Sequence, residues 1–155
     1  LALISLAIAS CASIPEEPVR SLTINEIKPR YIPERNFMRV GEYWTGAENK
    51  GNRVILRSEA AERSGYYFTL VLDAKVRDLP RGSVITGEFY TPLSKEPQVH
   101  DFRLPNKLPK TREIFVGLTG SDWPDPDAVP AAWRFTIKDA NGERLARKKS
   151  YLWSM

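Results

Sequence analysis

Acid–base chemistry in this chain would have to begin with His100, the single histidine among its 155 residues. Asp101 follows it, and a histidine oriented by a carboxylate is the arrangement that activates a serine nucleophile. In an extended strand, however, neighbouring side chains point to opposite faces, so His100 and Asp101 do not readily touch. No nucleophile-elbow motif supplies a serine. The sequence therefore predicts a protein that is not an enzyme and has no catalytic residue.

Metal chemistry is limited in the same way, because Cys11 is the single cysteine. A structural zinc site needs four ligands, and a disulfide within the chain needs a second thiol. The acidic segment Ser121–Asp127, SDWPDPD, offers three carboxylates that could bind calcium. Its spacing does not match the Asp-x-Asp-x-Asp-Gly loop, and its prolines remove flexibility. We expect no metal and no cofactor.

Aromatic side chains could instead contact a ligand. Trp123 lies next to Asp122 in the acidic segment, and Tyr43 is followed by Trp44 in the stretch FMRVGEYW. The face of an aromatic ring can stack on the apolar face of a sugar, so we take these four residues as candidate ligand contacts. The alternative for the acidic segment is a solvated loop that Trp123 pins to the domain.

The surroundings of Cys11 indicate a modification rather than a reaction. The apolar stretch before it, LALISLAIA, is about half as long as a bilayer span and suits the central region of a secretory signal. The residues Ile8-Ala9-Ser10-Cys11 resemble the lipobox of bacterial lipoproteins, in which an aliphatic residue and two small residues precede the cysteine. The resemblance implies cleavage between Ser10 and Cys11 and a diacylglycerol on the Cys11 sulfur.

Lipidation at Cys11 would also decide where the protein resides. Each buried CH₂ adds roughly 0.8 kcal/mol of membrane affinity, so several acyl chains hold a protein firmly. In the sorting rule that comes with the resemblance, an aspartate after the cysteine retains the protein at the inner membrane, and here that residue is Ala12. We expect a lipid-anchored protein of the bacterial cell envelope, at the outer membrane and facing the periplasm.

Positive charge gathers near the end of the chain, in ERLARKKSYLW, and the formal net charge is +4. Nucleic-acid binding would need such a patch together with stacking aromatic rings. An exported protein meets little nucleic acid, so we expect no partner of that kind. Protection of an edge strand and attraction to anionic headgroups are the two other interpretations.

Composition and turn signals divide the chain into three parts. Residues 1–10 are the partial signal peptide, residues 11–21 the lipidated cysteine and a proline-containing tether, and residues 22–155 a single domain. Within the domain, apolar alternation between Pro and Gly turns predicts seven to nine strands and no long helix. The expected strands are Ser21–Ile27, Phe37–Trp44, Arg53–Ser58, a strong strand from Gly65, Ser83–Thr91, Val99–Leu104, Arg112–Leu118, Ala132–Asp139 and Glu143–Trp153.

Several local signals refine these strands. Phe68, Leu70 and Leu72 are expected on one face of the strand from Gly65. Asn141-Gly142 predicts a hairpin before the last strand, and Pro29 and Pro33 are expected to stop regular structure. Together the pattern resembles an antiparallel β-sandwich of the immunoglobulin or fibronectin-III type, with a small β-barrel as the alternative.

The expected function is that of a non-catalytic module. A sandwich held at the membrane by its lipid anchor presents edges and loops to other molecules, so we expect a protein-interaction or structural role with another envelope protein. The alternative is a protein that binds glycan or peptidoglycan through the four aromatic and acidic candidates and its positive charge.

Overall fold

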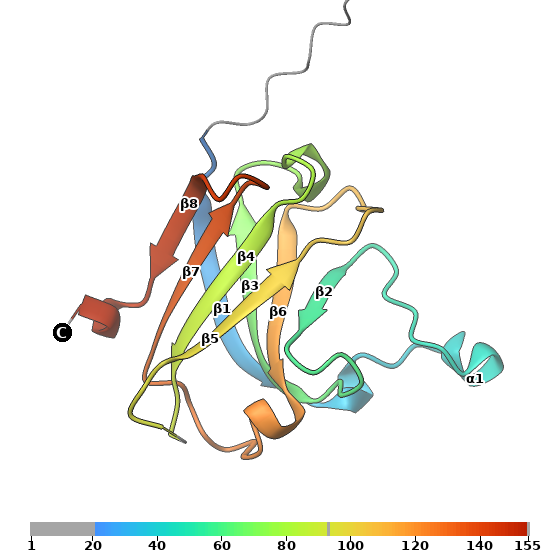
Figure 1. Ribbon diagram of the computed structural model, residues 1–155. Coiled ribbons are helices and arrows are strands. Elements are labelled where there is room, and N and C mark those ends of the chain that lie inside the picture. Colours follow the sequence, from blue (N-terminus) through green and yellow to red (C-terminus); the bar gives the residue numbers. More distant parts are fainter. Residues whose placement is uncertain (1–20, 93, 155) are drawn as a thin grey trace, which may run out of the picture.

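The computed structural model describes residues 21–92 and 94–154, which form two four-stranded β-sheets packed face to face (Figure 1). One sheet has the order β1-β3-β6-β2 and the other the order β5-β4-β7-β8. The strands are β1 (Ile24–Ile32), β2 (Val54–Arg57), β3 (Gly65–Leu72), β4 (Val84–Tyr90), β5 (Gln98–Arg103), β6 (Glu113–Thr119), β7 (Ala132–Lys138) and β8 (Arg144–Lys149). This arrangement confirms the predicted all-β sandwich, and the two open sheets do not form a barrel.

The strand order is that of an immunoglobulin or fibronectin-III sandwich with one addition. Without β2, the first, second and fifth strands form one sheet and the remaining four form the other. β2 lies at the far edge of the first sheet and pairs parallel with β6, from Val54 opposite Ile114 to Arg57 opposite Gly117. Every other strand pair is antiparallel. The parallel pair follows from the long connection 33–53, which carries the chain from β1 across to that edge.

The main core fills the space between the sheets. Phe68 of β3 lies 5.1 Å, ring centre to ring centre, from Phe89 of β4 and also from Phe135 of β7. Phe68, Leu70 and Leu72 all belong to this core, as the alternation in the sequence predicted. Packing of aromatic rings in tilted and edge-on pairs is favourable beyond the area that they bury.

A second, smaller core covers the other face of β3. Tyr67 is fully buried there and packs with Ile32, Phe37 and Ile55. The ring of Phe37 lies 4.8 Å from the ring of Tyr67. The central strand β3 is therefore apolar on both faces because the connection 33–53 folds back over the first sheet.

Two predicted strands differ from the structure. The segment Phe37–Trp44 is not a strand, since Phe37 ends the short helix η1 (Glu34–Asn36) and Glu42–Thr45 form the helical turn α1. β1 continues through Pro29 to Ile32, because an edge strand tolerates a residue that lacks an N–H donor.

The ends of the other elements follow turn chemistry. Gly142 has a φ of 82° in the hairpin between β7 and β8, at the predicted Asn-Gly turn. β8 is shorter than predicted, and the chain turns instead into the helix η4 (Tyr151–Ser154). Two more short helices, η2 (Val76–Asp78) and η3 (Gly120–Asp122), follow β3 and β6.

None of the helices within residues 21–92 and 94–154 has the length and apolar character needed to cross a membrane. The predicted lipobox and almost all of the predicted tether lie outside the described residues.

Candidate functional site: an aromatic projection on a buried ionic base

The connection 33–53 projects from the edge of the sandwich, and α1 stands apart from both sheets in Figure 1. Four large apolar side chains on this projection are exposed. Tyr43 and Trp44 keep 78% and 88% of their surface accessible to solvent. We call the group the aromatic tip: Met38, Val40, Tyr43 and Trp44. Exposed apolar side chains gathered on one short segment are typical of a contact surface.

Glu42 holds the aromatic tip to the domain. Its carboxylate turns inward, where it is buried, and Oε1 accepts a hydrogen bond from Arg63 Nη1 at 2.6 Å. Oε2 accepts a second bond from the backbone N–H of Arg39, also at 2.6 Å. Gly46, with a φ of 68°, then ends α1 in the left-handed conformation that favours glycine.

Glu48 extends this contact into a network below α1. Its Oε1 accepts a hydrogen bond from Arg57 Nη1 at 2.6 Å, and its Oε2 lies 3.1 Å from Arg63 Nε as an ion pair. Arg57 also donates from Nε to the hydroxyl of Tyr67 at 2.6 Å. That hydroxyl in turn donates to the backbone oxygen of Arg63 at 2.6 Å. We call Glu42, Glu48, Arg57, Arg63 and Tyr67 the ionic base.

The ionic base determines the protonation of its members. Burial alone would raise the pKa of Glu42, but the bonds from the Arg39 backbone and from Arg63 lower it. Burial alone would likewise lower the pKa of Arg57, but Glu48 and Tyr67 raise it. Both groups therefore stay charged in the folded protein. The guanidinium of Arg57 also lies 4.9 Å from the centre of the Phe37 ring, within the range of a cation–π contact.

This arrangement is suited to binding. The lowered pKa of Glu42 keeps its carboxylate ionised, where it accepts hydrogen bonds from Arg63 and from the Arg39 backbone. No group of three or more potential metal ligands is found in the described part of the chain. The ionic base anchors the backbone of α1, from which the two exposed rings extend, so a partner does not have to order this segment on binding.

The structure corrects the prediction for Trp123. Its side chain is buried, with 4% of its surface exposed, and its ring lies 5.1 Å from the ring of Tyr66. A sugar therefore cannot stack on Trp123, and the residue instead pins the loop 120–128 to the main core. This agrees with the alternative drawn from the sequence, a loop that Trp123 pins to the domain.

Asp122 and His100 lie together, apart from the aromatic tip. Asp122 Oδ1 is 4.0 Å from His100 Nε2, and Gln98 Oε1 is 3.2 Å from the same nitrogen. Asp101 lies on the opposite face of β5, where it accepts a hydrogen bond from Thr86. No hydrogen bond, ion pair or ring contact in the described residues joins Asp122 and Trp123 to Tyr43 and Trp44.

The basic run lies on β8, an edge strand of the second sheet. Arg147 donates to the hydroxyl of Thr136 at 3.0 Å, and Lys148 Nζ donates to the backbone oxygen of Asn25 at 3.4 Å. Arg147 and Lys148 are therefore both hydrogen-bonded within the domain. The placement agrees with the interpretation that they protect an edge strand from unwanted pairing.

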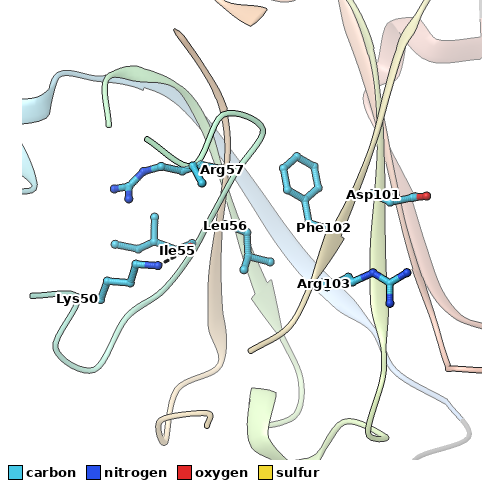
Figure 2. Close-up of a pocket in the computed structure, with 8 residues that line it drawn as sticks. Lys50, Ile55, Leu56, Arg57, Asp101, Phe102 and Arg103 are labelled. Carbon is cyan, nitrogen blue, oxygen red and sulfur yellow. Dashed lines mark hydrogen bonds between the residues drawn. The ribbon is translucent and has the colours of Figure 1, made fainter. Parts of the chain in front are cut away.

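A groove that was not predicted lies between β2 and β5, the adjoining edges of the two sheets. Figure 2 shows part of it, with Leu56 and Phe102 in the space between the two strands, Lys50 on one side and Arg103 extending on the other. The residues that line it come from separate segments of the chain, so no motif marked it.

Comparison of the chain with protein-family models, with curated proteins and with solved structures found no match.

Proposed function

We propose that this protein is a non-catalytic binding module of the bacterial cell envelope, whose aromatic tip contacts a partner protein. The observation that carries the proposal is the exposure of Tyr43 and Trp44 above the buried ionic base. Tyrosine and tryptophan are enriched among the residues that dominate binding energy at protein interfaces. The ionic base adds to this, because the backbone of α1 is already ordered before a partner binds.

A glycan is the second candidate, and it is favoured by the adjacent exposed rings of Tyr43 and Trp44. Sugar recognition also needs polar groups that hydrogen-bond the hydroxyls around the ring. At the aromatic tip, the nearest carboxylate is that of Glu42, and both of its oxygens are bonded inward to Arg63 and the Arg39 backbone. We therefore favour a protein partner.

The membrane anchor is the other part of the proposal. The lipobox-like residues Ile8-Ala9-Ser10-Cys11 support lipidation at Cys11, and Ala12 supports sorting to the outer membrane. In the native host, the full chain is expected in the membrane fraction with an intact mass that includes acyl chains. The Cys11→Ser variant is expected to lack that mass and to leave the membrane fraction. A soluble, unlipidated wild-type chain would contradict the anchor without affecting the proposal for the aromatic tip.

Photo-crosslinking tests the contact made by the aromatic tip. A photoreactive phenylalanine replaces Trp44 in one strain and Tyr151 in another, because both positions are 88% exposed. We expect a discrete protein adduct from position 44 in living cells and none from position 151. The adduct should also be lost when Tyr43→Ser is added. Equal labelling from both positions, or an adduct that is glycan alone, would contradict a protein partner.

A further inference from the structure

The groove between β2 and β5 continues beyond the part drawn in Figure 2. Two larger hollows, of about 630 and 590 Å³, extend it past the loop that connects β5 to β6. Arg103 lines all three hollows, which therefore adjoin one another around it. We call the three hollows together the basic groove.

The charge of the basic groove is one-sided. Its lining includes one acidic residue, Asp101, whose carboxylate is bonded to Thr86. Arg57 also reaches the lining, but it is paired with Glu48. The remaining cations come from three separate segments of the chain and are Lys50, Arg53, Arg77, Arg81, Arg103 and Lys107.

Within residues 21–92 and 94–154, none of these six cations is held in a salt bridge. Lys50 Nζ donates to the backbone oxygen of Ile55, and Arg53 Nε donates to the backbone oxygen of Lys50, which leaves both charges in place. Burial and the positive charges of Arg39 and Arg57 lower the pKa of Arg53 by more than the carboxylates of Glu48 and Glu42 raise it.

We propose that the basic groove binds a linear polymer that carries phosphate groups along its length. Four of the six cations are arginines. The guanidinium of Arg53 lies 5.8 Å from the centre of the Phe37 ring. The other three arginines are exposed and can donate paired hydrogen bonds to phosphate oxygens; they are Arg77, Arg81 and Arg103. Cations that line a recessed surface suit a narrow chain. A flat membrane surface would contact the raised parts of the protein more readily. Phe102 is the one aromatic residue in the lining, and it is buried, so the groove has no platform for stacked nucleic-acid bases.

Binding to linear inorganic polyphosphate tests the proposal. The full chain carries Cys11→Ser in every arm, so that a lipid anchor does not contribute. Against this background, Arg103→Glu with Lys107→Glu is expected to weaken binding at least about tenfold and to reduce its salt dependence. The matched control is Arg144→Glu with Lys95→Glu, an equal change of charge at two exposed positions outside the groove. The control is expected to stay within about twofold of the parent.

Circular dichroism melting of both double variants establishes that each is folded. Equal loss of affinity in the two variants would mean that overall charge, and not the groove, attracts the polymer, and would overturn the proposal. Three further ligands test its chemistry. Polyglutamate of matched charge, vesicles rich in phosphatidylglycerol and single-stranded DNA are each expected to bind more weakly than polyphosphate. Equal or tighter binding of polyglutamate or of the vesicles would contradict a site for phosphate polymers. Equal or tighter binding of single-stranded DNA would contradict the inference that the groove has no platform for stacked bases.

Discussion

Arg63 donates from Nη1 to Oε1 of Glu42 across 2.6 Å, although 21 residues separate them in the chain. The bond joins α1, which carries the aromatic tip, to the segment that enters the central strand β3. Because Glu48 and Arg57 continue the network to β2, the projection is held on two sides. The connection 33–53 is thereby anchored to the sandwich.

Removal of Arg57 should destabilise the whole domain. Its side chain is only 5% exposed, and Arg57→Met would leave the carboxylate of Glu48 buried with one fewer partner. Breaking a buried ion pair in this way costs about 3 kcal/mol of unfolding free energy, measured by urea denaturation. Arg103→Met, at an exposed arginine of β5, serves as the control and should change stability by less than about 0.5 kcal/mol. Equal effects of the two substitutions would argue against the ionic base.

Acid should weaken the fold through Glu88. Arg134 donates to its carboxylate from Nε at 2.5 Å and from Nη2 at 2.7 Å, and this lowers the pKa of Glu88 in the folded state, despite partial burial. The unfolded chain then takes up its proton at a higher pH than the folded chain does. The stability from this pair is present above the ordinary pKa of 4.5 and is lost as pH falls through the lower folded value.

Urea unfolding measured between neutral pH and strongly acidic pH checks this behaviour. Glu88→Gln should flatten the dependence of unfolding free energy on pH below the ordinary glutamate range. Arg134→Met should flatten it as well, since it removes the donor that shifts the pKa. Glu42 contributes in the same direction through Arg39 and Arg63, so some acid sensitivity remains in both variants. An unchanged slope in Glu88→Gln would contradict the assignment.

Truncation of two tryptophans should change the unfolding free energy by very different amounts. Trp123→Ala removes a buried ring from its contact with Tyr66 and should cost about 3 kcal/mol or more of unfolding free energy. Trp44→Ala removes a ring that is 88% exposed and should change stability by less than about 0.5 kcal/mol. Thermal denaturation of both variants checks the contrast. A stable Trp123→Ala variant would show that this ring is not part of the core.

Gly117 should resist replacement because of its neighbour across the sheet. A Cβ atom at Gly117 would lie 2.5 Å from Cε1 of Tyr67. The buried ring of Tyr67 cannot easily move, because its hydroxyl accepts a hydrogen bond from Arg57 and donates one to the backbone oxygen of Arg63. Gly117→Ala should therefore cost about 2 kcal/mol. At Gly41 nothing lies closer than 4.0 Å and the φ is −62°, so Gly41→Ala should be nearly neutral in the same urea assay.

Much of the sandwich was predictable because its strands follow local rules. Period-two alternation located β3, and the Asn141-Gly142 turn located the last hairpin. The segment Phe37–Trp44 was assigned wrongly because its apolar residues serve different purposes. Phe37 is buried in the second core, whereas Tyr43 and Trp44 are exposed. A linear pattern does not separate an apolar residue that is buried from one that is displayed.

The candidate sites were less predictable because tertiary contacts create them. Tyr43 and Trp44 were found from residue type alone, but the ionic base beneath them joins residues on four different segments. Trp123 has the same chemistry as Trp44 and the opposite environment. The basic groove depends on the parallel pairing of β2 with β6. These strands are far apart in the chain, so no turn motif predicts that they pair.

The affinity of the protein for the partner captured at position 44 tests the central claim most directly. The comparison is between Tyr43→Ser with Trp44→Ser at the aromatic tip and Tyr151→Ser with Leu152→Ser at another exposed apolar pair. If the aromatic tip is the contact surface, the first variant binds at least about a hundredfold more weakly at an unchanged melting temperature, and the second stays within about threefold of wild type. Wild-type affinity in the tip variant, or equal losses in both, would contradict the account.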